Sequence, residues 1–142
     1  MNLALDLAQD AYRSNEVPVG AVIVRDDRVI GRGKNEMIAR SDPTAHAEIL
    51  ALREAGERTG NYRLEDADLY VTLEPCIMCA GALLQARIRR LFYAAYDPKA
   101  GAVDSLYKLL GDPRLHHQVE VTAGIGEDEA REILQRFFSE RR

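Results

Sequence analysis

The sequence has no long apolar run, no tryptophan and only two cysteines. No stretch approaches the roughly 18 apolar residues of a membrane-spanning helix, so we expect no membrane segment. The N-terminus lacks the basic start and the apolar run of a secretory signal, so we expect a cytoplasmic protein. Because that compartment is reducing, we do not expect Cys76 and Cys79 to form a structural disulfide.

A surplus of positive charge is also absent. The chain of 142 residues carries 19 lysines and arginines against 23 aspartates and glutamates, which gives a formal net charge of −4. A protein that coats nucleic acid non-specifically usually needs a broad basic face, and this balance argues against one. Short basic clusters within residues 87–99 and 136–142 still allow a local basic groove, although a solvated surface is the simpler interpretation.

Hydrophobic residues make up 46% of the chain, enough to bury a proper core. No linker, internal repeat or change of composition divides the sequence, so we predict one domain over residues 1–142. Apolar residues at helical spacing, with local start and stop signals, predict helices over residues 3–14, 45–55, 76–86, 105–110 and 128–138. Asp42 and Pro43 are expected to begin the second of these helices, and Gly56 is expected to end it.

Short apolar runs rich in β-branched residues predict strands over residues 17–24, 29–33, 68–73, 90–95 and 119–122. Asp26 and Asp27 form the turn that joins the first two strands in a hairpin. Strands that alternate with helices after an opening hairpin indicate a mixed sheet with helices on both faces. We therefore predict an α/β fold with three layers (α/β/α) around a five-stranded mixed sheet.

One group of residues carries chemistry: His46 and Glu48, followed later in the chain by Cys76 and Cys79. An imidazole and two thiolates are good zinc ligands, and zinc prefers four ligands, so one position is left for water. The two cysteines are three positions apart at the opening of a predicted helix, which puts both sulfurs on one side of its first turn. Glu48 supplies a carboxylate that can move the proton of that water. A metal with an open position beside a general base indicates hydrolysis.

Two other interpretations of the cysteines stay open at this point. The first is a thioredoxin-like redox pair, which gives no role to His46 or Glu48 and lacks the usual preceding tryptophan and intervening proline. The second is a closed structural zinc site, whose fourth ligand would have to be His116 or His117. The plain interpretation of those two histidines is a polar loop before the last strand.

The pattern H-x-E followed by P-C-x-x-C is the signature of zinc-dependent nucleobase deaminases. Longer strings resemble the bacterial tRNA-specific adenosine deaminases, a branch of the cytidine deaminase-like superfamily. These strings are EVPVGAV (16–22), DPTAHAE (42–48), NYRL (61–64), LYVTLEPCIMCAGA (69–82) and residues 101–106. The resemblance extends from about residue 3 to residue 138 and implies one deaminase domain with the cytidine deaminase-like fold.

The resemblance also implies a reaction, the conversion of adenosine to inosine at the wobble position of a tRNA anticodon, with an arginine tRNA as the natural substrate. His46, Cys76 and Cys79 would hold one zinc ion per subunit, and the hydroxide on that zinc would attack C6 of the adenine. Glu48 would take the proton of the water, pass it to N1 of the ring and help ammonia leave.

Further residues acquire roles only through the resemblance. Asn35 would hydrogen-bond the flipped nucleotide, Val17 would line the base pocket, and Asp97 would contact the backbone of a neighbouring nucleotide. Taken alone, Asn35 and Asp97 are ordinary turn residues and Val17 is a core residue. The resemblance also implies a homodimer, and it implies that the anticodon stem-loop approaches Phe138, Arg141 and Arg142 of the terminal helix.

Two positions depart from the family pattern, Lys34 before Asn35 and Tyr96 before Asp97, and both concern the RNA groove. Two other functions therefore remain. A deaminase of a free base or nucleotide, of the guanine or cytosine type, needs a closed pocket, often with an aromatic lid; the 6% of aromatic residues in this chain favours an open site. A zinc-stabilised RNA-binding module without catalysis would have no use for Glu48.

Overall fold

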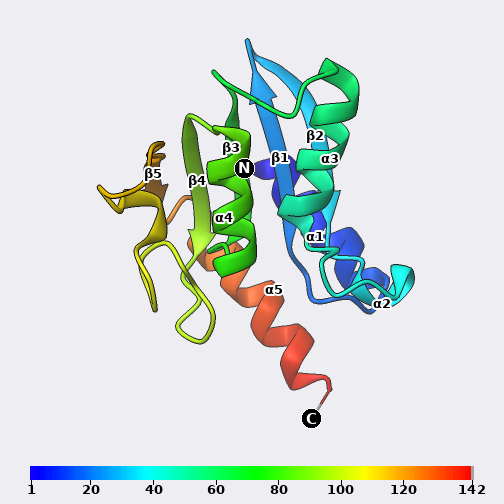
Figure 1. Ribbon diagram of the computed structural model, residues 1–142. Coiled ribbons are helices and arrows are strands. Elements are labelled where there is room, and N and C mark those ends of the chain that lie inside the picture. Colours follow the sequence, from blue (N-terminus) through cyan, green and yellow to red (C-terminus); the bar gives the residue numbers. More distant parts are fainter. Residues whose placement is uncertain (142) are drawn as a thin grey trace.

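The computed structural model describes residues 1–141 and contains a mixed sheet covered by helices on both faces (Figure 1). The five strands of the described residues lie in the order β2-β1-β3-β4-β5. The pairs β2–β1 and β1–β3 are antiparallel, whereas β3–β4 and β4–β5 are parallel. The strands are β1 (Gly20–Arg25), β2 (Arg28–Lys34), β3 (Asp68–Leu73), β4 (Arg90–Ala95) and β5 (Glu120–Ala123).

Two pairs of helices form the outer layers. Figure 1 shows α3 and α4 over one face of the sheet and α1 and α5 over the other. Together with two short elements they are α1 (Asn2–Arg13), α2 (Met37–Arg40), α3 (Ala47–Thr59), α4 (Ile77–Ala86), η1 (Leu109–Gly111) and α5 (Glu127–Ser139). The three-layer α/β/α architecture predicted from the sequence is confirmed. Within residues 1–141, no helix combines the length and the apolar character needed to span a membrane.

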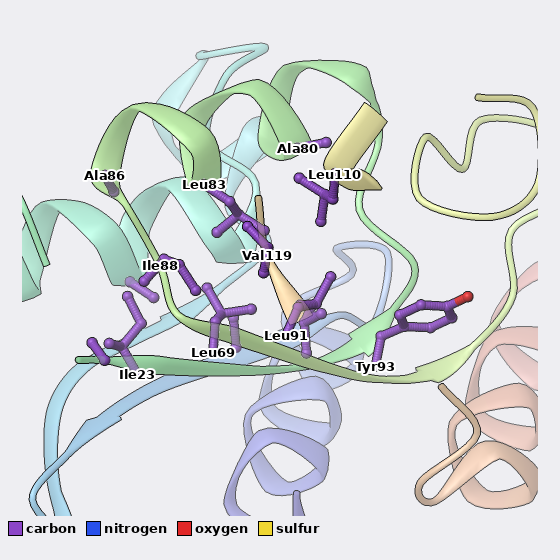
Figure 2. Packing of buried hydrophobic residues seen from close by; sticks show 14 of the residues in the cluster. Ile23, Leu69, Ala80, Leu83, Ala86, Ile88, Leu91, Tyr93, Leu110 and Val119 are labelled. Atoms are coloured by element: carbon purple, nitrogen blue, oxygen red, sulfur yellow. The ribbon is translucent and has the colours of Figure 1, made fainter. Parts of the chain in front are cut away.

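Each face of the sheet has its own apolar core. Figure 2 shows side chains of the larger core, where Leu83 of α4 packs onto Leu69 of β3 and Leu91 of β4. The smaller core joins Leu5 of α1 and Ile133 of α5 to the end of β4. The apolar faces predicted for these elements are therefore the faces that pack.

Glycine at position 33 brings the helix α3 close to the sheet. A Cβ atom on Gly33 of β2 would lie 2.1 Å from the carbonyl oxygen of Ala47, the first residue of α3. Real Cβ atoms do not approach an oxygen so closely, so only glycine permits this packing distance. The start of α3, which carries His46 and Glu48, is thereby held directly against β2.

Two predicted helix boundaries and one predicted helix are wrong. Residues 42–44 form a turn, in which the Asp42 carboxylate accepts hydrogen bonds from the backbone and hydroxyl of Thr44, and α3 begins only after His46. The helix also continues through Gly56 and ends at Gly60, which adopts the left-handed conformation (φ 68°). Residues 105–110 do not form an α-helix; the only helical turn there is the short 3-10 turn η1, which begins at Leu109.

Candidate metal centre and substrate groove

Two helix N-termini meet at the group of residues singled out from the sequence. His46 is the N-cap residue of α3 and Cys76 is the N-cap residue of α4, both with extended backbones. Glu48 and Cys79 lie in the first turns of the same two helices. Unpaired backbone N–H groups and the positive ends of both helix dipoles therefore surround this point, which favours thiolate, carboxylate and hydroxide.

The separations of the three candidate ligand atoms fit zinc. His46 Nδ1 lies 3.7 Å from Cys76 Sγ and 3.6 Å from Cys79 Sγ. With a Zn–S distance of about 2.3 Å and a Zn–N distance of about 2.0–2.1 Å, tetrahedral geometry separates nitrogen from sulfur by about 3.5–3.6 Å. All three atoms lie within 4.8 Å of one another, and the donor set of one nitrogen and two sulfurs suits zinc. Three protein ligands leave the fourth tetrahedral position free for water.

The ionisation of this group reflects a shared proton. A hydrogen bond from Cys79, with help from His46, lowers the pKa of Cys76 to about 4, although burial acts in the opposite direction. The same hydrogen bond, together with burial, raises the pKa of Cys79. A dication between the two sulfurs would replace the shared proton, because coordinating thiols are deprotonated.

Glu48 is the buried carboxyl of the site. Only 4% of Glu48 is exposed, and this burial raises its pKa to about 7, partly offset by a hydrogen bond to backbone and by the charge of His46. A carboxyl in such surroundings is suited to accept and return protons. A site that only stabilised the fold would gain nothing from burying it there.

Asn35 lies against the start of α3. Its side-chain oxygen Oδ1 accepts a hydrogen bond from the backbone N–H of Ala47 at 2.8 Å, and 5% of the residue is exposed. This bond satisfies one free N–H of the helix and fixes the orientation of the side-chain amide. Within residues 1–141 no protein acceptor takes the Nδ2 amino group, which remains available to donate to a bound molecule.

Val17 and Asp97, predicted from the resemblance alone, line one open groove, and the residues that line it do not include the three candidate metal ligands or Asn35. The groove has a volume of about 770 Å³ and runs between the ends of β3 and β4 and the helix α5. Tyr96 and Phe138, which are 48% and 50% exposed, lie along it. The structure therefore gathers an apolar floor, two aromatic side chains and one carboxylate in a single groove.

Arg141, which the resemblance places near the RNA, makes contacts within the protein itself. The guanidinium of Arg141 stacks over the ring of Phe137 and donates hydrogen bonds to the carbonyl oxygen of Phe137 and to Asn15. Arg142 lies outside the described residues.

His117, considered from the sequence as a fourth zinc ligand, instead donates a hydrogen bond from Nε2 to the carbonyl oxygen of Ile88 at 2.7 Å. Within residues 1–141 the metal-ligand group contains His46, Cys76 and Cys79.

Sequence reasoning missed three buried carboxylates, those of Glu16, Asp68 and Glu74, and the first and last of these bind segments outside the sheet. Glu16 is 2% exposed and accepts hydrogen bonds from the backbone N–H groups of Ile38 and Ala39 at the start of α2. Glu74 is also 2% exposed and binds the segment that follows β4. Both residues precede a proline by one or two positions, which is a weak signal, and their partners lie at least 22 positions away.

Comparison with known proteins agrees with this site. Residues 1–95 match the model of the cytidine and deoxycytidylate deaminase zinc-binding region. The chain is 53% identical to the tRNA-specific adenosine deaminase of Agrobacterium fabrum, over 100% of this chain and 93% of that protein. It is 50% identical to the tRNA-specific adenosine deaminase of Haemophilus influenzae, over 100% of this chain and 83% of that protein.

Comparison with solved structures also identifies deaminases. A structure from a study of A-to-I editing by tRNA:A34 deaminases has a TM-score of 0.91 at 53% identity, covering 94% of this chain and 97% of that one. The guanine deaminase of Nitrosomonas europaea has a TM-score of 0.83 at 24% identity, covering 97% of this chain and 82% of that one, and so shares the fold.

The fold and the site define a zinc-dependent deaminase of the cytidine deaminase type. Within that class, the chain belongs to the family of tRNA-specific adenosine deaminases.

Proposed function

We propose that this protein converts adenosine to inosine at the wobble position of a tRNA anticodon, with water as co-substrate and ammonia as the second product. The observation that carries the proposal is the buried Glu48 beside three clustered zinc-ligand side chains, in a chain similar over its whole length to tRNA-specific adenosine deaminases. An anticodon base is accessible to such a site because loop bases can leave the stack and enter a pocket.

His46, Cys76 and Cys79 hold the zinc in this proposal. When bound, zinc makes a coordinated water acidic enough to act as a nucleophile near neutral pH. The imidazole and the two thiolates would hold the ion and leave room for a water, and the helix N-termini of α3 and α4 favour the negative charge of the thiolates.

Glu48 moves the protons. Its carboxylate accepts a proton from the attacking water and delivers it to N1 of the adenine ring. It then transfers the second proton of that oxygen to the amino group on C6, so that the C–N bond breaks and ammonia leaves. Burial suits Glu48 to both steps, because a desolvated carboxyl gives up its charge readily.

The remaining residues position the nucleotide. Asn35 donates from Nδ2 to an acceptor of the flipped nucleotide, since its Oδ1 is already bound to Ala47. Val17 provides apolar contact in the pocket, and Asp97 accepts a hydrogen bond from the backbone of a neighbouring nucleotide at the groove. These contacts select an exposed, unpaired adenosine.

We further propose that the enzyme works as a homodimer in the cytoplasm, on an arginine tRNA. An exposed groove of about 690 Å³ between α3 and α4, lined by Leu52, Tyr62 and Ala82, supports the homodimer, since Tyr62 is 70% exposed. A tRNA substrate and a pair of free cysteines support the reducing cytoplasm.

Inosine formation tests the proposed function. Zinc-loaded protein is incubated with an anticodon stem-loop that carries adenosine at the wobble position, and the nucleosides are analysed by mass spectrometry. We expect inosine, and we expect a chelator to abolish it. Deamination of free guanine or cytosine, with no inosine in the stem-loop, would refute the proposal in favour of a small-molecule deaminase.

A further inference from the structure

A single buried carboxylate, that of Glu74, binds the segment that follows β4. Glu74 comes directly after β3 and directly before Pro75 and Cys76, the metal ligand at the start of α4. Only 2% of the residue is exposed. Its backbone N–H donates to the carbonyl oxygen of Ala95 at 2.8 Å, so the ends of β3 and β4 are joined here.

Both oxygens of this carboxylate are surrounded by donors. Oε1 accepts from the backbone N–H of Asp97 at 3.0 Å and from the hydroxyl of Ser105. Oε2 accepts from the backbone N–H groups of Val103 at 3.1 Å, Asp104 at 2.8 Å and Ser105 at 2.9 Å. Residues 97–105, which we call the Glu74-bound segment, form no helix or named strand, so this carboxylate replaces the missing backbone partners.

The Glu74-bound segment also packs against the metal ligand itself. Gly101 forms an isolated β-bridge with Cys76, and Ala102 donates to the carbonyl oxygen of Pro75 at 2.9 Å. A Cβ atom on Gly101 would lie 2.3 Å from the Cδ atom of Glu74, so glycine lets the backbone close over the carboxylate. The segment leaves β4 and returns to the start of α4 (Figure 1).

The same segment builds one wall of the substrate groove. Asp97 lines the groove and is the first residue of the segment that Glu74 holds. Tyr96, directly before it, packs edge-on against Tyr93 with a ring separation of 5.4 Å, and the Tyr93 hydroxyl donates to Asp104. Loss of the Glu74 carboxylate should therefore alter the positions of both Tyr96 and Asp97.

We propose that Glu74 is a positioning residue, whose carboxylate fixes residues 97–105 so that Tyr96 and Asp97 form the groove wall at a set place relative to Cys76. Its effect on substrate rests on the proposed function. All three candidate metal ligands lie at the N-termini of α3 and α4, so we expect zinc binding to survive the loss of this carboxylate. Substrate binding suffers instead, because the groove wall is no longer fixed.

The variant Glu74→Gln tests this inference, because the amide keeps the size of the side chain but turns one acceptor into a donor that faces N–H groups. Asp68→Asn, at the opposite end of β3, is the matched control, since it changes another buried carboxylate, one that does not line the groove. For Glu74→Gln we expect one zinc per chain, faster amide hydrogen exchange across residues 97–105, a rise in KM of about tenfold for the stem-loop and less than about a threefold change in kcat. For Asp68→Asn we expect unchanged KM and unchanged exchange in that segment.

Ser105→Ala provides a milder variant with an exposed side chain, which keeps the test available if Glu74→Gln does not fold. It removes one of the five hydrogen bonds, and we expect a smaller rise in KM in the same direction. An unchanged KM with unchanged exchange, or a KM raised equally by Asp68→Asn, would overturn the inference. If the wild-type enzyme makes no inosine, the proposed function fails, and hydrogen exchange alone, which needs no substrate, decides whether Glu74 holds the segment.

Discussion

Replacing Asp68 by asparagine measures how strongly one buried carboxylate stabilises the start of the parallel pair β3–β4. Asp68 is 5% exposed and lies opposite Arg90 in the strand register. Its oxygens accept two hydrogen bonds from Arg89, at 3.1 and 3.0 Å, and two from Arg90, at 3.1 and 2.6 Å. Asparagine keeps the size of the side chain but removes the charge and replaces one acceptor with a donor that faces these guanidinium groups.

The exposure of the partners sets the size of the effect. Breaking a fully buried ion pair costs about 3–5 kcal/mol, whereas an exposed pair contributes about 0–1 kcal/mol. The side chains of Arg89 and Arg90 are 48% and 41% exposed, so solvent screens both of them. We therefore expect a loss of about 2 kcal/mol in the free energy of unfolding. For a chain of this size, that loss lowers Tm by about 6–10 °C.

The stability difference between wild type and Asp68→Asn should become smaller as the pH falls. Burial alone would raise the pKa of Asp68, but hydrogen bonds from Arg90 and Arg89 outweigh it and hold the pKa below its ordinary value of 3.8. A group with a lowered folded-state pKa contributes its full stability above the unfolded pKa and loses it as pH falls through the folded pKa. The difference between wild type and Asp68→Asn should therefore be full at pH 7 and should shrink as the pH falls below about 4.

Urea unfolding of both proteins at pH 7 and at a series of acid pH values checks this prediction. Comparison of the two proteins removes the effect of acid on zinc binding, which they share. A difference at pH 7 below about 0.5 kcal/mol would place the pair among ordinary surface ion pairs and refute the estimate. A difference that stays constant down to acid pH would refute the assignment to the charge of Asp68.

Three further predictions concern the metal centre and its support. Glu48→Ala should keep zinc and stem-loop binding, measured by metal analysis and fluorescence anisotropy, but lower kcat by about 10³-fold or more because the proton carrier is lost; an unchanged kcat would exclude the proposed mechanism. His46→Ala should lose both zinc and activity, and one zinc per chain in that variant would mean that the ligands are wrongly assigned. Gly33→Ala should lower the free energy of unfolding by about 2–4 kcal/mol, because its Cβ would meet the carbonyl oxygen of Ala47; a thermal scan with an unchanged Tm would contradict that contact.

Local sequence patterns predicted correctly those elements whose residues contact their neighbours at a regular spacing along the chain. The strands over residues 68–73 and 90–95 were predicted with the bounds that β3 and β4 have, because their apolar runs are short and bounded by charged or turn residues. The hairpin at Asp26 and Asp27 follows from the same local logic. The candidate metal ligands, which the structure brings together, could also be named in advance, since the chemistry of zinc admits few combinations of side chains.

Helix start and stop signals were misleading where another local signal competed with them. Pro43 and Asp42 are typical of a helix start, yet the Asp42 side chain closes a turn and His46 becomes the N-cap of α3. Gly56 is typical of a helix end, yet Gly60 supplies the left-handed residue and the helix continues to it. A glycine inside a helix costs only about 1 kcal/mol relative to alanine, which packing easily offsets.

The amino-acid sequence by itself determined the class of chemistry, because an imidazole, two thiols and a carboxylate at this spacing have few other uses. Only the tertiary structure decided how the groove wall is held. The backbone N–H groups of residues 103–105 bind the Glu74 carboxylate 29 to 31 positions earlier in the chain, and the helix predicted over residues 105–110 does not form. A buried charge takes whichever donors the fold brings to it, and no local pattern in the sequence records which ones those are.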